Sequence, residues 1–76
     1  MTDEELLDRI VINPRVMVGK PVVRGTRLTV ECILNALAHE MTVGDILTEY
    51  PGLIREDILA CLLFAKTKLK VSKSEC

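Results

Sequence analysis

The residue types that could do chemistry in this chain are few and scattered. Among its 76 residues there is one histidine, His39, and the three cysteines Cys32, Cys61 and Cys76 form no Cys-x-x-Cys pair. A metal site needs a cluster of such ligands, and a catalytic nucleophile needs a base close to it. The sequence offers neither pattern, so we expect a protein that is not an enzyme and that uses no cofactor.

The remaining polar candidates have simpler structural explanations. His39 falls near the end of a predicted helix, where its side chain can donate to the last carbonyl groups. Glu56 and Asp57 fall in the first turn of a later predicted helix, where acidic side chains complement the helix dipole. We therefore expect structural roles for these three residues.

The strongest chemical signal is a basic segment, rich in turn residues, that leads into a helix. Residues 9–27 carry five cations and no acid, whereas acids predominate in residues 31–57. Cationic side chains neutralise phosphates, and the amide groups of a helix N-terminus add donors. Duplex DNA is therefore an expected partner, and the candidate contacts are Lys20, Arg24, Arg27, Thr29 and Arg55. The alternative is that these cations only protect an exposed strand edge from aggregation.

Short apolar runs separated by turn residues predict a β arm or hairpin over residues 9–28. The runs occupy residues 10–12, 16–18 and 22–23, a pattern typical of strands. Gly25 is expected to supply the positive φ of a tight turn. Strands this short do not form a stable sheet alone, so the arm must lie on the helices or pair with a second copy. We favour pairing across a homodimer.

The spacing of apolar residues predicts a core of three helices over residues 29–70. Thr29 is a natural N-cap for the first helix and Thr42 for the second, which ends before Pro51. The third helix is expected over about residues 55–70. Three helices with tight connections indicate a mainly α fold of the helix-turn-helix type.

The third predicted helix is more apolar than one core requires. Its expected core stripe consists of Ile58, Cys61, Leu62, Ala65 and Leu69. Further apolar residues widen the surface beyond one face, which indicates more than one covered side. We therefore expect a protein interface on this helix at Leu59, Leu63 and Phe64. Val22 and Val23 of the β arm are the other candidate interface residues. The alternative is that these residues are buried inside the homodimer.

Length and hydropathy set the remaining expectations. A chain of this size buries only about 60% of its unfolded surface, so it is expected to form one domain over residues 1–76 and to gain from dimerisation. The longest apolar run is far below the roughly 20 residues needed to cross a membrane, and the acidic start does not resemble a signal peptide. We expect a cytoplasmic protein that makes no membrane contact, with residues 71–76 as a flexible tail.

The chain resembles, in the order of its motifs, the small prokaryotic proteins of domain of unknown function 433. The likeness covers about residues 9–66 and includes Gly-Lys-Pro at 19–21, Gly-Thr-Arg at 25–27, Tyr-Pro at 50–51 and Glu-Asp at 56–57. The resemblance implies a homeodomain-like or winged-helix-like core with an N-terminal β arm. It also implies an antitoxin-like protein, often dimeric, whose partner is a PIN-like nuclease toxin.

The function expected from the residues and the resemblance is that of a regulator in a toxin-antitoxin pair. Such a protein would be non-enzymatic, would act as a dimer and would bind DNA. The alternative is a protein-protein interaction adaptor that binds no nucleic acid, which the net charge of −1 favours. One departure from the family is Ile54, where Ser or Thr is usual as the N-cap. The loss of the Ser or Thr cap costs about 1 kcal/mol of stability unless Ile54 packs against other residues.

Overall fold

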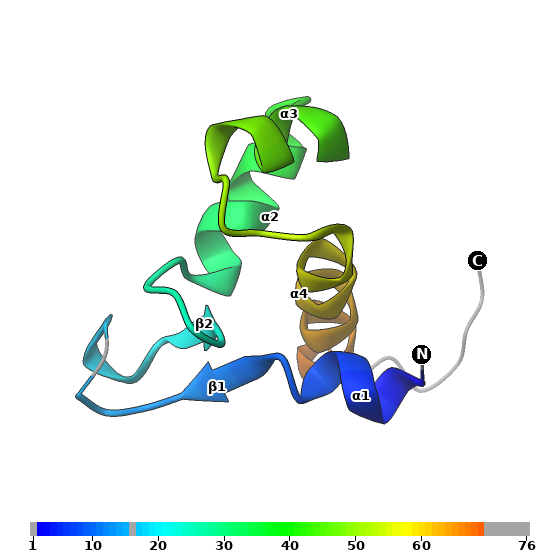
Figure 1. Ribbon diagram of the computed structural model, residues 1–76. Coiled ribbons are helices and arrows are strands. Elements are labelled where there is room, and N and C mark those ends of the chain that lie inside the picture. The colour runs from blue at the N-terminus through cyan, green and yellow to red at the C-terminus, as the bar shows by residue number, and fades with distance from the viewer. Residues whose placement is uncertain (1, 16, 70–76) are drawn as a thin grey trace.

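The computed structural model describes residues 2–15 and 17–69, and the tail expected over residues 71–76 lies outside them (Figure 1). Within the described part the chain is mainly helical, with a small antiparallel sheet near its start. The elements in chain order are α1 (Asp3–Leu7), β1 (Ile10–Ile12), η1 (Met17–Gly19), β2 (Pro21–Val23), α2 (Val30–Ala38), α3 (Val43–Glu49) and α4 (Arg55–Lys68).

The short helix α1 precedes the β arm and was not predicted. The Thr2 hydroxyl accepts a hydrogen bond from the Glu5 amide, and the Glu5 carboxylate accepts one from the Thr2 amide. This reciprocal capping box holds the helix start. Five residues are too few to show a helical apolar period, but the Thr-x-x-Glu spacing was a signal that could have predicted the helix. In the folded chain α1 lies against α4 (Figure 1).

The β arm forms a hairpin within one chain. β1 pairs antiparallel with β2, with Ile10 opposite Val23 and Val11 opposite Val22. The other edge of β2 is occupied by a bridge between Val22 and Thr29. Both edges of β2 are therefore occupied within one chain, and β2 also packs against α2, which agrees with the expectation that the arm lies on the helices. Self-association of the chain stays a prediction.

Two turns shape the arm. Gly25 has φ +82°, which confirms the predicted tight turn. The apolar run at 16–18 was expected to be a strand, and this prediction is wrong: Met17–Gly19 is a 3-10 turn in which Val18 has φ +56° and is 92% exposed. Met17–Gly19 lies between β1 and β2, beyond the last ladder pair of Ile12 and Pro21, so the described sheet does not hold it extended; Val16 lies outside the described residues.

The first two helices of the core begin where the sequence predicts. The Thr29 hydroxyl accepts from the Cys32 amide, and Thr42 forms a capping box with Asp45. His39 is the C-cap of α2, with Nδ1 2.7 Å from the Asn35 carbonyl oxygen. The predicted boundaries hold because side-chain capping is local and depends little on the rest of the fold.

An aliphatic core joins β2 with α2, α3 and α4. Its members are buried almost completely, and they include Val23, Ile33, Ile46 and Ile58. Because this packing involves three helices, it confirms a mainly α fold with a small sheet. None of the described helices is long and apolar enough to cross a membrane.

The inner side of α4 differs from the predicted core stripe. Ile58 and Cys61 are fully buried as expected, but Leu62 is 45% exposed and Leu69 is 73% exposed. Ala60, which was not in the predicted stripe, is buried. Apolar residues occur on every side of this helix, so their spacing alone could not identify the side that faces the core.

Candidate functional site

An apolar groove lies between α2 and the C-terminal half of α4, two helices that lie side by side in Figure 1. Its volume is about 630 Å³. On α2 the lining residues are four apart along the sequence, a spacing that places them on one face of a helix. The apolar part of the lining consists of Pro21 from β2, of Val30, Leu34 and Ala38 from α2, and of Phe64, Ala65 and the C-cap Leu69 from α4.

The charged residues at the edge of the groove already have partners. Lys20 Nζ lies 3.4 Å from Glu31 Oε1, and both side chains are exposed. An exposed pair of this kind stabilises a protein by less than about 1 kcal/mol. Lys68 Nζ lies 5.3 Å from the centre of the Phe64 ring, close enough for a cation–π contact. The groove therefore offers an apolar surface with charges only at its margin, which suits the binding of another apolar surface.

The candidate interface residues from the sequence do not form one surface. Val22 and Val23 are 1% exposed, so they belong to the interior of the single chain and offer no surface to a partner. Phe64 lines the groove. Leu59 is 39% exposed but does not line the groove, and Leu63 is partly buried.

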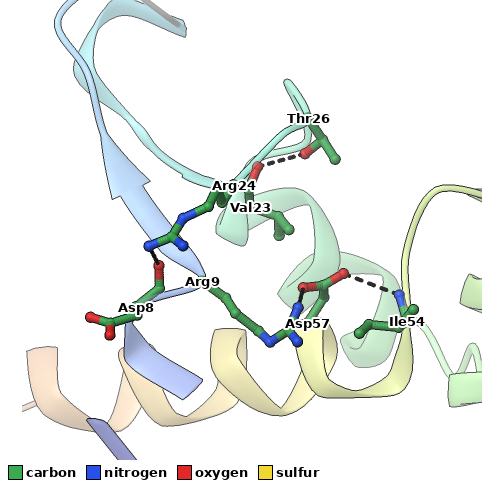
Figure 2. A network of polar contacts seen from close by, with 7 residues as sticks. All are labelled: Asp8, Arg9, Val23, Arg24, Thr26, Ile54 and Asp57. Carbon is green, nitrogen blue, oxygen red and sulfur yellow. Dashed lines mark hydrogen bonds and ion pairs between the residues drawn. The ribbon is translucent and has the colours of Figure 1, made fainter. Parts of the chain in front are cut away.

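Two of the candidate nucleic-acid contacts are engaged within the chain. Lys20 pairs with Glu31 at the groove. The Arg24 guanidinium donates to the carbonyl oxygen of Asp8, just before β1 (Figure 2). These two cations therefore have local acceptors that compete with a phosphate.

Of the other three nucleic-acid candidates, Thr29 lines the same groove as Lys20, whereas Arg27 and Arg55 do not line it. Thr29 is 8% exposed and its hydroxyl is used as the N-cap of α2. Arg27 lies at a second hollow, which Glu49 also lines. Arg55 is exposed at the first position of α4. The structure thus brings Lys20 and Thr29 to one groove, and Arg24, Arg27 and Arg55 do not line it.

A buried carboxylate organises the start of α4 (Figure 2). The Asp57 side chain is 8% exposed; its Oδ1 accepts from Arg9 Nη1 at 3.0 Å and its Oδ2 accepts from the Ile54 amide at 3.1 Å. Ile54 itself provides no side-chain cap and is 45% exposed. Asp57 therefore supplies a hydrogen bond at this helix start. From its position in the sequence Asp57 was expected only to complement the helix dipole, although an acid three residues after the N-cap also predicts this bond.

The buried thiol of Cys61 is unsuited to nucleophilic chemistry. Burial, and secondarily the charge of nearby Asp57, raise the pKa of Cys61 to about 12. Since the thiolate is the reactive form, Cys61 stays protonated at neutral pH. Its role is to fill the core.

Comparison with known proteins places the chain in a family. The crystal structure of a DUF433 member protein from Anabaena variabilis is similar, with a TM-score of 0.78 and 27% sequence identity. The similarity covers 88% of this chain but 66% of that one, just under two thirds of its length. No protein of curated function matches. The family described as "Protein of unknown function (DUF433)" matches residues 10–65, most of the sequence, and the chain belongs to this family.

Proposed function

We propose that this protein is a non-enzymatic, antitoxin-like regulator that binds a protein partner through the groove between α2 and α4. The supporting observation is the lining, in which Pro21 and six apolar residues from two helices form one continuous hollow. A volume of about 630 Å³ lies within the usual range for binding sites, and two neighbouring helices suit the apolar face of a partner helix. The partner that we propose is a PIN-like nuclease toxin.

The test of this proposal is binding to the product of the adjacent reading frame. Ala38 is an exposed residue of α2 that lines the groove, so Ala38→Glu places a charge there in a residue type compatible with a helix. We expect it to weaken the complex at least about tenfold, equivalent to about 1.4 kcal/mol. The matched control is Thr48→Glu, at an exposed position of α3 that does not line the groove. A complex unaffected by Ala38→Glu would exclude the groove, and no complex would exclude the antitoxin-like function.

Self-association is proposed at the outer edge of β1. β2 lies between β1 and Thr29, so the outer edge of the described sheet belongs to β1, where Ile12 is 55% exposed. Addition of a second copy at such an edge is a common mode of β pairing. A charge on an edge strand discourages pairing, so Ile12→Lys should lower the dimer fraction in sedimentation equilibrium. A wild-type monomer throughout the micromolar range would contradict the dimer.

Binding of duplex DNA is the second candidate function. It is supported by the three consecutive helices α2, α3 and α4. It is also supported by Arg27 and Arg55, which are exposed and take part in neither ion pair of the described residues. Arg24 donates to the carbonyl oxygen of Asp8, so a phosphate must displace this contact, whereas the exposed Lys20–Glu31 pair is weak and leaves Lys20 available. If DNA is not bound, the protein is an interaction adaptor that uses the same groove.

A further inference from the structure

The outward side of α4 carries a second apolar surface. Arg55, Leu59, Leu62 and Lys66 are spaced four, three and four residues apart, which places them on one face of a helix. Leu59 is 39% exposed and Leu62 is 45% exposed, and both cations are exposed. We call these four residues the outer face. It presents two adjacent leucines to solvent between two positive charges.

Neither cation of the outer face takes part in an ion pair among the described residues, although the acidic helix α1 packs against another part of α4. The two ion pairs found there use Arg9 and Lys20 and leave out Arg55 and Lys66. Of the acids on α4, Asp57 is buried against Arg9. Glu56 follows Arg55 directly and so projects about 100° away around the helix. The outer face therefore contains cations and leucines but no acid.

The outer face adjoins the groove at the C-terminal end of α4. The groove is lined there by Phe64, Ala65 and Lys68 and by Leu69, which directly follows the helix. Leu69 lies seven residues after Leu62 and so continues the stripe of the outer face, but the four residues of the outer face do not themselves line the groove. From residue 55 to residue 66 the helix rises about 16 Å, roughly three turns. This length matches a partner helix that contributes two or three apolar side chains at helical spacing.

We propose that the outer face binds an amphipathic helix of a partner protein whose apolar stripe is flanked by acidic residues. The apolar stripe would cover Leu59 and Leu62, and the flanking carboxylates would lie near Arg55 and Lys66. Charge complementarity of this kind selects the partner and speeds association. The outer face includes none of the α2 residues that line the groove, so a variant on α2 distinguishes the two sites.

A second copy of the chain fits the outer face poorly. An antiparallel pair of α4 helices would bring Arg55 toward Lys66 of the copy, and a parallel pair would bring each cation next to its equivalent. Like charges at these positions oppose association. A phosphate backbone would satisfy the cations but would leave Leu59 and Leu62 against a polar surface. An acidic helix is the occupant that satisfies both the leucines and the cations.

The test uses two synthetic helical peptides with the same leucine stripe, one flanked by glutamates and the other by lysines. Their binding to the full chain is measured by fluorescence anisotropy at low and high salt. We expect the glutamate peptide to bind at least about tenfold more tightly, a difference of about 1.4 kcal/mol, and to weaken as salt screens the charges. Equal affinity for the two peptides, or no binding of either, would overturn the proposal.

Variants of the chain separate the outer face from other surfaces. Leu62→Glu should abolish peptide binding, and the double variant Arg55→Glu with Lys66→Glu should reverse the preference toward the lysine peptide. Arg27→Glu, an exposed cation elsewhere, is the control that should retain the preference, and circular dichroism verifies folding of each variant. Loss of binding in the groove variant Ala38→Glu would overturn the assignment to the outer face. So would a homodimer that only Leu62→Glu dissociates, or binding of duplex DNA through Arg55 and Lys66 without peptide binding.

Discussion

Arg9 Nη1 lies 3.0 Å from Asp57 Oδ1, a contact between residues 48 positions apart. It joins the segment that precedes β1 to the first turn of α4 (Figure 2). The second oxygen of the same carboxylate accepts from the Ile54 amide. One side chain therefore stabilises a helix start and also attaches the N-terminal part of the chain to the core.

Replacement of Asp57 by alanine should lower the free energy of unfolding by about 2 kcal/mol. The variant loses a charge-assisted hydrogen bond to Arg9 and leaves the Ile54 amide without its partner, and each loss costs about 1 kcal/mol or more. Urea denaturation gives the value. Asp45→Ala, in the exposed capping box of α3, is the comparison and should cost about 1 kcal/mol. An equal loss in the two variants would show that the Arg9 contact contributes nothing.

Replacement of Gly25 by alanine should destabilise the chain, whereas the same change at Gly52 should not. Gly25 has φ +82°, and an added Cβ would meet no atom within 4 Å, so the cost of about 1 kcal/mol comes from the left-handed backbone alone. Gly52 has similar open space and no left-handed φ. Alanine there should be neutral or slightly stabilising because it restricts the unfolded chain. Thermal melting of the two variants side by side makes the comparison, and equal melting temperatures would contradict it.

The stability of the protein should fall in alkaline solution because of Cys61. Its pKa is raised to about 12 in the folded chain from an ordinary value of 9.0, so the folded state holds the proton over a range in which the unfolded state releases it. The contribution is complete below pH 9 and is lost as the pH rises toward 12.

Cys61→Ala provides the check on this dependence. The variant should have a lower free energy of unfolding than wild type at neutral pH because it leaves a cavity. The difference between the two free energies of unfolding should shrink between pH 9 and 12. Other groups titrate in both proteins, so the difference between the two curves isolates the thiol. A constant difference across this range would exclude the proposed cause.

Binding of duplex DNA should depend moderately on salt. Each phosphate contact contributes a slope of about −0.9 to the plot of log affinity against log salt. Arg24 is engaged by the Asp8 carbonyl oxygen, whereas the exposed Lys20–Glu31 pair is too weak to withhold Lys20. We therefore expect contacts from Lys20, Arg27 and Arg55 and a slope of about −3. Fluorescence anisotropy with a duplex measures it, and Arg27→Ala should reduce the slope by about one. A slope of about −4 would mean that all four cations reach the DNA, and no binding at low salt would leave the adaptor function.

The local features of the fold could be predicted from the sequence, and the tertiary ones could not. Thr29 and Thr42 located the starts of α2 and α3 because a cap is read from neighbouring residues. Gly25 located its turn for the same reason. The surroundings of Val22 depend on segments far along the chain, and this residue was expected at an interface but lies in the core.

The candidate site shows the same limit. Phe64 was named from the sequence as an interface candidate, which stays a prediction, and its place in a groove depends on how α4 packs beside α2. Leu62 was assigned to the core because a uniformly apolar helix gives no direction. Its exposure next to Leu59 became apparent only when the buried side of α4 was known.

The contact between Arg9 and Asp57 bears on where the folding unit starts. The family match begins at residue 10, one residue after Arg9, and it also omits α1, which lies against α4. A fragment trimmed to the matched residues would retain Asp57 but lose its cationic partner, leaving a poorly hydrated carboxylate at the start of α4. The smallest autonomous version of this protein therefore includes the preceding helix, and expression vectors that follow the family boundaries should yield a less stable product.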